Sequence, residues 1–99
     1  MITREEVDAI IFGALAALNE ERVPKDQIDV STSTPLFGVD AAIDSLGFVS
    51  VISDVELALN IDYGLDISLA DDRALSRAQS PYATAETLRN YILELIADQ

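Results

Sequence analysis

The sequence of 99 residues contains no cysteine and no histidine. Without cysteine the chain cannot form a disulfide, supply a thiolate nucleophile or bind an iron–sulfur cluster. Without histidine it lacks the side chain that most often acts as a general base at neutral pH. An esterase that uses a serine nucleophile therefore has no imidazole to activate it and stays a formal possibility. A hydrolase would therefore lack its usual base.

Basic residues are also scarce, with six Lys and Arg against 18 Asp and Glu and a net charge of −12. None lies between Lys25 and Arg73, and this interval contains ten acids: Asp26, Asp29, Asp40, Asp44, Asp54, Glu56, Asp62, Asp66, Asp71 and Asp72. Such a charge repels nucleic acid and anionic lipid head groups, so neither is an expected partner. It favours protein partners with basic patches, although an acidic surface that keeps the chain in solution explains it equally well.

Long apolar runs are absent as well, although 49% of the residues are hydrophobic. No run approaches the ~20 residues of a membrane-spanning helix, and no basic segment followed by an apolar one begins the chain. We therefore expect a single domain over residues 1–99 that is monomeric, cytoplasmic and not inserted in a membrane.

The N-terminal segment has the features of an amphipathic helix. Thr3 and Glu6 have the spacing of a capping box, and Pro24 limits the C-terminal end, which we expect between Asn19 and Glu21. The apolar stripe between them contains Val7, Ile10, Ile11, Ala14, Leu15 and Leu18. This spacing predicts the first long helix.

Residues 22–43 show no sustained period and predict a long loop. A loop of this length in a small domain needs side chains that hold it, so we expect it to lie across the helices. The available apolar residues are Ile28, Val30, Leu36, Phe37, Val39 and Ile43. Residues 24–28 could add a short helical turn.

Asp44 is a good N-cap for a second helix that begins at Ser45. The residues predicted to face the core are Phe48, Val51, Ile52, Val55, Ala58 and Leu59. Asp62 would continue this face, where an unpaired carboxylate is costly, so we expect the helix to end or bend near Asn60 to Ile61, with Tyr63-Gly64 as the exit.

Two further helices complete the prediction. Residues 67–75 predict a short helix capped by Ser68, which Gln79-Ser80-Pro81 would end. Thr84 is a suitable N-cap for a last helix with the apolar residues Ala85, Leu88, Tyr91, Ile92, Leu95 and Ile96. The sequence thus predicts an all-α bundle of three longer helices and a short one, with a long loop between the first and second helices.

Ser45 lies where unpaired backbone N–H groups and the helix dipole stabilise an attached anion. Asp44-Ser45-Leu46, which follows Leu36-Phe37-Gly38 and opens a helix in a small acidic chain, resembles the attachment motif of acyl carrier proteins. The resemblance extends along essentially the whole chain. It implies the four-helix acyl-carrier bundle, with 4′-phosphopantetheine from coenzyme A esterified to Ser45. The resemblance further implies that the protein is not itself an enzyme and needs no catalytic residue of its own. The reactive sulfur then comes with the prosthetic group, in agreement with the missing Cys and His.

The resemblance also implies roles and partners. A phosphopantetheinyl transferase would modify Ser45, with Asp44 capping the helix and offering oxygens to Mg²⁺ during transfer. An acyl ligase or acyltransferase would load the thioester, and synthase-type enzymes of fatty acid, polyketide or lipid biosynthesis would use it. Leu46 would be an exposed apolar contact for these enzymes. An aminoacyl or peptidyl carrier is an alternative within the same chemistry.

The chain departs from the fatty-acid-synthesis carriers on the outward face of this helix. Those carriers present an acidic ridge, whereas here Leu46, Val49 and Leu57 are outward, with Asp54 and Glu56 at the edges. We expect these five residues to bind partners, through basic or apolar docking patches, and the protein to be a specialised carrier. The alternatives are scattered surface apolar residues and an unmodified acidic helical module that docks on a basic protein.

No metal site is expected among the acids of residues 62–72. Asp62, Asp66, Asp71 and Asp72 lack the register of a calcium-binding loop and its terminal Glu. We interpret them as solvated charges.

Overall fold

The computed structural model describes residues 2–36, 41–69 and 82–97. In chain order these contain α1 (Arg4–Glu20), the 3-10 helix η1 (Pro24–Asp26), α2 (Ser45–Tyr63) and α4 (Ala85–Ala97). Within these ranges the protein is all-helical with three α-helices, and its β contact is an isolated bridge between Pro35 and Thr84. No helix in these ranges combines the length and the hydrophobicity needed to cross a lipid bilayer.

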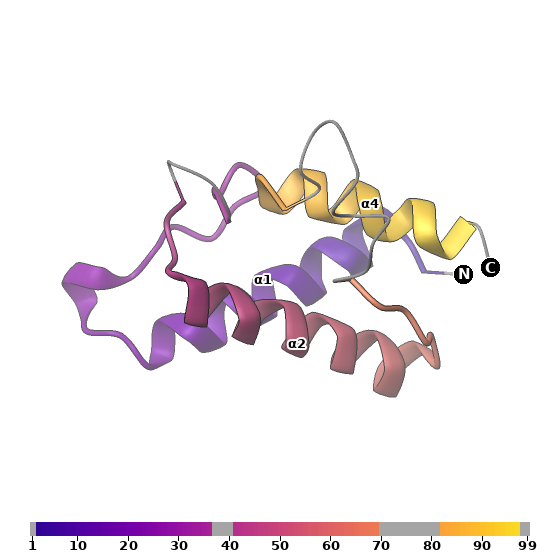
Figure 1. Ribbon diagram of the computed structural model, residues 1–99, viewed down its shortest axis with the longest axis horizontal. Coiled ribbons are helices and arrows are strands. Elements are labelled where there is room, and N and C mark those ends of the chain that lie inside the picture. The colour runs from indigo at the N-terminus through magenta and orange to yellow at the C-terminus, as the bar shows by residue number, and fades with distance from the viewer. Residues whose placement is uncertain (1, 37–40, 70–81, 98–99) are drawn as a thin grey trace.

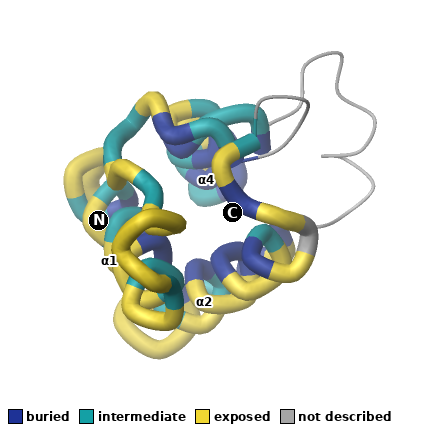
Figure 2. Tube along the Cα trace, turned by 90° about the vertical axis from the view of Figure 1, so that its left-hand side faces the viewer, coloured by how far each residue is buried: buried dark blue, intermediate teal, exposed yellow. Residues whose placement is uncertain are grey.

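Helix α1 is the centre of the bundle because it packs against both α2 and α4. Both of these helices run in the opposite direction to α1, so the start of α2 lies at the end of the bundle where α1 finishes (Figure 1). Viewed along the bundle, the buried stretches of the three helices face inward and the exposed stretches face outward (Figure 2). The largest fully buried side chains are Tyr91, Ile11, Leu15, Leu36, Leu59, Leu69, Leu88, Ile92, Val7, Val51 and Val55.

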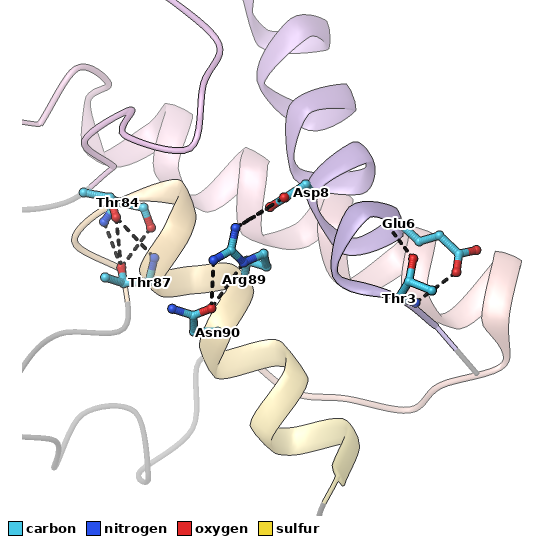
Figure 3. A network of polar contacts seen from close by, with 7 residues as sticks. All are labelled: Thr3, Glu6, Asp8, Thr84, Thr87, Arg89 and Asn90. Atoms are coloured by element: carbon cyan, nitrogen blue, oxygen red, sulfur yellow. Dashed lines mark hydrogen bonds and ion pairs between the residues drawn. The ribbon is translucent and has the colours of Figure 1, made fainter.

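The predicted caps of α1 and α4 are confirmed (Figure 3). Glu6 N donates to Thr3 Oγ1 over 3.2 Å, and Thr3 N donates to Glu6 Oε1 over 2.9 Å, which completes the capping box. At α4, Thr84 and Thr87 exchange equivalent bonds, each backbone N–H donating to the other hydroxyl. An ion pair of 3.3 Å between Arg89 and Asp8 joins α4 to α1.

The loop between α1 and α2 lies across the helices, as predicted. Its first part is held by Asn19, whose side chain exchanges two bonds of 2.9 Å with the backbone of Ile28. Leu36 and Ile43 are buried and Ile28 packs against the core, whereas Val30 is 37% exposed and does not hold the loop. The predictions for Phe37 and Val39 lie outside the described residues. The predicted turn near Pro24 is η1.

The loop also covers the start of α4. Ala85 N donates to Thr34 O over 3.0 Å, and Glu86 N donates to Thr32 O over 2.8 Å. These two amides belong to the first turn of α4, where a helix offers them no acceptor of its own. The backbone of the loop therefore satisfies them, which explains why a segment without regular structure has a defined course.

Helix α2 continues past the point at which we expected it to end because of Asp62. It runs to Tyr63 without a break and ends at Gly64, the predicted exit, which adopts the left-handed conformation with φ of 66°. Asp62 is exposed. The core does not extend to this last turn, so the carboxylate stays in water, and the end or bend predicted near Asn60 to Ile61 does not occur.

The predicted short helix over residues 67–75 is not helical in its described part, residues 67–69. Ile67 and Leu69 are buried, while Asp66 and Ser68 are exposed. This alternation has the period of an extended segment and not that of a helix. The prediction for residues 70–75, and the helix stop at Gln79-Ser80-Pro81, lie outside the described residues.

Candidate functional site

The N-terminal turn of α2 is built on Asp44. Its backbone is extended (φ −83°, ψ 177°), and its Oδ1 accepts a hydrogen bond of 2.7 Å from Gly47 N. Its carbonyl accepts the first helical bond, from Phe48 N at 2.8 Å. Asp44 is therefore the N-cap, as predicted, and its exposed carboxylate places a negative charge at the N-terminus of the helix.

Ser45 is the first residue of α2. In this position its backbone N–H and that of Leu46 precede the helical hydrogen-bond ladder, so the helix itself offers them no acceptor. Two N–H groups aligned along the positive end of a 19-residue helix favour a negative group beside them. The prediction that Ser45 begins the helix is confirmed, and its modification stays a prediction.

The first turn of α2 packs closely against the end of α1, and Gly47 makes this approach possible. A Cβ at Gly47 would lie 3.1 Å from Asp44 Oδ1 and 3.4 Å from both Arg22 Nη2 and Leu18 Cδ2. The space beside Gly47 is thus closely bordered by the capping carboxylate, a guanidinium and an apolar side chain. A Cβ at this position would require the capping carboxylate of Asp44 to shift by a few tenths of an ångström.

Arg22 brings a positive charge to this turn. Its Nη2 reaches the Gly47 position, while its Nη1 donates to Asp26 O over 3.3 Å, which ties the guanidinium to η1. A phosphate at the N-terminus of α2 would find a cation on the same end of the bundle. Sequence reasoning missed Arg22, because its approach to α2 depends on how the ends of the two helices pack and no local pattern signals it.

One turn farther along α2, Phe48 joins the site to a later part of the chain. Its ring makes an edge-on contact with Tyr82, with centroids 5.2 Å apart and planes at 78°. The Tyr82 hydroxyl donates to the carbonyl of Leu69. The half-buried Phe48 is therefore part of the scaffold behind the first turns, as its assignment to the core face predicted.

The outward face of α2 is apolar at the positions that the sequence indicated. Leu46 is 77% exposed, and Val49 and Leu57 are each 57% exposed. Leu46 and Val49 lie beside Ser45 and Asp44, whereas Leu57 lies about three turns farther along the helix. Ile61, 68% exposed, extends this face and was not among the predicted contact residues.

The two acids at the edges of this face differ. Asp54 is exposed. Glu56 is half-buried, and its Oε1 accepts a hydrogen bond of 3.2 Å from Leu69 N, which fastens the segment after α2 to the helix. Glu56 thus has a structural role beside the predicted contact with partners, and the sequence held no sign of this bond because its two ends are 13 residues apart.

The described ranges contain no group of three or more acidic side chains placed to hold a metal ion. The features that the structure brings together are a capped helix start, a nearby guanidinium and an exposed apolar face. Comparisons of the chain with protein-family models, with curated proteins and with solved structures find no match.

Proposed function

We propose that the protein is a discrete, specialised acyl carrier that holds acyl intermediates as thioesters on 4′-phosphopantetheine attached to Ser45. The observation that carries the proposal is the local structure around this serine. Ser45 opens α2, Asp44 caps the helix directly before it, and the exposed Leu46 directly follows. The proposal includes the four-helix bundle of acyl carrier proteins, of which the described residues contain three helices.

The residues around Ser45 fit a phosphate ester. The N-terminal N–H groups of α2 and the guanidinium of Arg22 favour a negative charge at this end of the helix. Asp44 is acidic, so it stabilises the helix start while its exposed carboxylate can share a Mg²⁺ with the incoming phosphate during transfer. When bound, the prosthetic group supplies the thiol that this sequence lacks.

The other residues serve recognition. We propose that Leu46 and Val49 contact the phosphopantetheinyl transferase and the loading enzyme, an acyl ligase or acyltransferase. Both side chains are exposed beside the serine, and two neighbouring apolar residues bury area on docking that polar residues would not. Asp54, Glu56 and Leu57 extend this surface toward synthase-type enzymes.

The test is mass spectrometry after incubation with coenzyme A and a broad-range phosphopantetheinyl transferase. The wild-type chain should gain about 340 Da, the mass of the prosthetic group. Ser45→Ala should gain nothing. Ser50→Ala removes an exposed serine from the same helix and should behave as wild type. Absence of the mass gain with several transferases would overturn the proposal.

A second candidate is an unmodified helical interaction module. The exposed apolar residues of α2 and the net charge of −12 favour it, because such a surface suits a protein partner whether or not Ser45 is modified. Under this function, wild type gains no mass with any transferase. An aminoacyl or peptidyl carrier would instead take the prosthetic group and then be loaded by an amino-acid-adenylating enzyme.

A further inference from the structure

A pocket lies at the end of the bundle opposite Ser45. The start of α1 and the C-terminal ends of α2 and α4 come together at this end (Figure 1). The pocket has a volume of about 330 Å³, and its described lining residues are Ile2, Glu6, Tyr63, Leu65 and Ile96. Ser45 and Tyr63 are the two ends of the 19-residue α2, so roughly 27 Å separates the pocket from the modification site, at about 1.5 Å per residue.

The walls of the pocket are aliphatic and come from three parts of the chain. Ile2 precedes α1, Leu65 follows the C-cap of α2, and Ile96 is in the last turn of α4. All three are half-buried and pack against the core, so they form a supported apolar surface. The volume is near the lower limit of small-molecule sites, about 300–1,000 Å³, and therefore suits a small ligand.

The polar side chains of the pocket are hydrogen-bond acceptors. Glu6 Oε1 accepts from Thr3 N, and Glu6 Oε2 accepts from the Tyr63 hydroxyl, which thereby uses its single proton. Hydrogen bonds from the Thr3 backbone and then from Tyr63 lower the pKa of Glu6, so its carboxylate is ionised at neutral pH. An ionised carboxylate has about four acceptor positions, and these two bonds use only two of them. A ligand that meets these side chains must therefore donate hydrogen bonds.

We propose that this pocket binds a small primary alkylamine in its protonated form. An ammonium group donates three hydrogen bonds and carries a positive charge, so it suits a site with acceptors and an ionised carboxylate. Its hydrocarbon chain would lie between Ile2, Leu65 and Ile96, away from water. An alkyl carboxylate would bring a second negative charge close to Glu6. The inference goes beyond the proposed function and does not depend on modification of Ser45.

The test uses the unmodified full-length protein with hexylamine, hexanol and hexanoate, three probes of equal chain length. Amide chemical shifts follow binding and locate the site. Hexylamine should give saturable shifts centred on Ile2, Glu6, Tyr63, Leu65 and Ile96, and added salt should weaken its binding. Hexanol should bind about fivefold or more weakly, because it forms no charge-assisted hydrogen bond, and hexanoate should not bind. Butylamine should bind more weakly than hexylamine, by up to about fourfold per methylene lost.

Two matched variants separate the pocket from the acidic surface around it. Glu6→Gln keeps the size of the side chain and one carbonyl oxygen but removes the charge, so the preference for hexylamine over hexanol should fall to about twofold or less. Glu5→Gln removes the neighbouring charge, which is exposed and is not among the described lining residues, and should keep the wild-type preference. The preference is a ratio of two affinities within one variant, so a change in stability alone does not alter it.

Other results overturn the proposal. Equal binding of hexylamine and hexanol to wild type would show that charge plays no part, and an equal loss of preference in Glu5→Gln would show that Glu6 has no special role. Shifts that spread over the exposed acids without saturation would indicate attraction to the net charge of −12 alone. Tighter binding of N-acetyl-lysinamide than of hexylamine would assign the pocket to a lysine of a partner protein. Failure here is distinguishable from failure of phosphopantetheine transfer at Ser45, because no modified protein is used.

Discussion

The hydroxyl of Tyr63, in the last turn of α2, donates a hydrogen bond of 2.9 Å to Glu6 Oε2 in the first turn of α1. The other oxygen of this carboxylate accepts from Thr3 N and completes the capping box. One side chain thus caps α1 and holds the end of α2. Hydrogen bonds from the Thr3 backbone and then from Tyr63 lower the pKa of Glu6 below its ordinary value.

These contacts predict a stability that depends on pH. Because the pKa of Glu6 is lower in the folded state, its contribution is present above the ordinary value of 4.5 and is lost as the pH falls through the folded pKa. The difference in unfolding free energy between wild type and Glu6→Gln should be largest at neutral pH and shrink in acid. Urea denaturation from pH 7 to pH 3, about the range in which Glu titrates, measures it. A difference that stays constant would contradict the prediction.

The hydrogen bond of Tyr63 predicts that its contribution to stability is lost in alkali. The hydrogen bond to Glu6 raises the pKa of Tyr63 above 10.0, so its contribution is present below that value and is lost as the pH rises through the folded pKa. Tyr63→Phe should be less stable than wild type at pH 7, and this difference should shrink above pH 10. Ultraviolet titration of the tyrosines together with urea denaturation checks both points.

Substitutions of Asp44 should separate its effect on the unfolding free energy from its effect on phosphopantetheine transfer. Asp44→Ala loses the bond from Gly47 N and should destabilise the protein by about 1 kcal/mol, whereas Asp44→Asn keeps a capping oxygen and should stay within a few tenths of wild type. Under the proposed function, both variants should accept phosphopantetheine more slowly, because neither has the charge that binds Mg²⁺. Denaturation and the rate of mass gain give the two readings. If Asp44→Asn gains mass at the wild-type rate, the carboxylate of Asp44 does not bind Mg²⁺ during transfer.

The helices α1, α2 and α4 were predictable because their signals are local. The capping box at Thr3, the cap at Asp44 and the left-handed Gly64 each depend on residues within one turn. The exposed positions of Leu46, Val49 and Leu57 followed from helical periodicity for the same reason. Element type and face could therefore be inferred before any tertiary contact was known.

What the sequence did not reveal depends on contacts between distant segments. Arg22 reaches the first turn of α2 because α1 ends where α2 begins, which is a property of the packing. The bond from Leu69 N to Glu56 likewise requires the segment after α2 to turn back along the helix. Asp62 was misjudged because a helical wheel shows the direction of a side chain, not where the core ends along the axis.

The two helical glycines Gly13 and Gly47 predict different responses to alanine. Gly13 is exposed within α1, and no atom lies within 4 Å of the position that a Cβ would take there, so Gly13→Ala should raise the unfolding free energy by about 0.5–1 kcal/mol through helix propensity. At Gly47 the new methyl group would meet Asp44 Oδ1 at 3.1 Å and disturb the cap. Gly47→Ala should therefore gain clearly less, or lose stability. Equal gains in unfolding free energy for the two variants, measured by urea denaturation, would show that the first turn of α2 accommodates a methyl group without disturbance of the cap.

Substitution of Thr34 tests how firmly the loop is attached to α4. This residue is 4% exposed, its hydroxyl donates to Asp29 O over 2.6 Å, and the same oxygen accepts from Ser31 N. Thr34→Val keeps the shape but leaves both backbone groups without their partner, which should cost about 1–3 kcal/mol. The exposed Ser33 is the control, and Ser33→Ala should cost about 0.5 kcal/mol or less.

The loss at Thr34 should also appear in α4. Ala85 N and Glu86 N donate to the carbonyls of Thr34 and Thr32, so a loosened loop exposes these amides to water. Hydrogen exchange at Ala85 and Glu86 should become faster in Thr34→Val by more than the change in global stability requires, and should stay as in wild type in Ser33→Ala. If exchange there follows global unfolding alone, the loop and α4 open as one unit, and the hydroxyl of Thr34 does not hold them together locally.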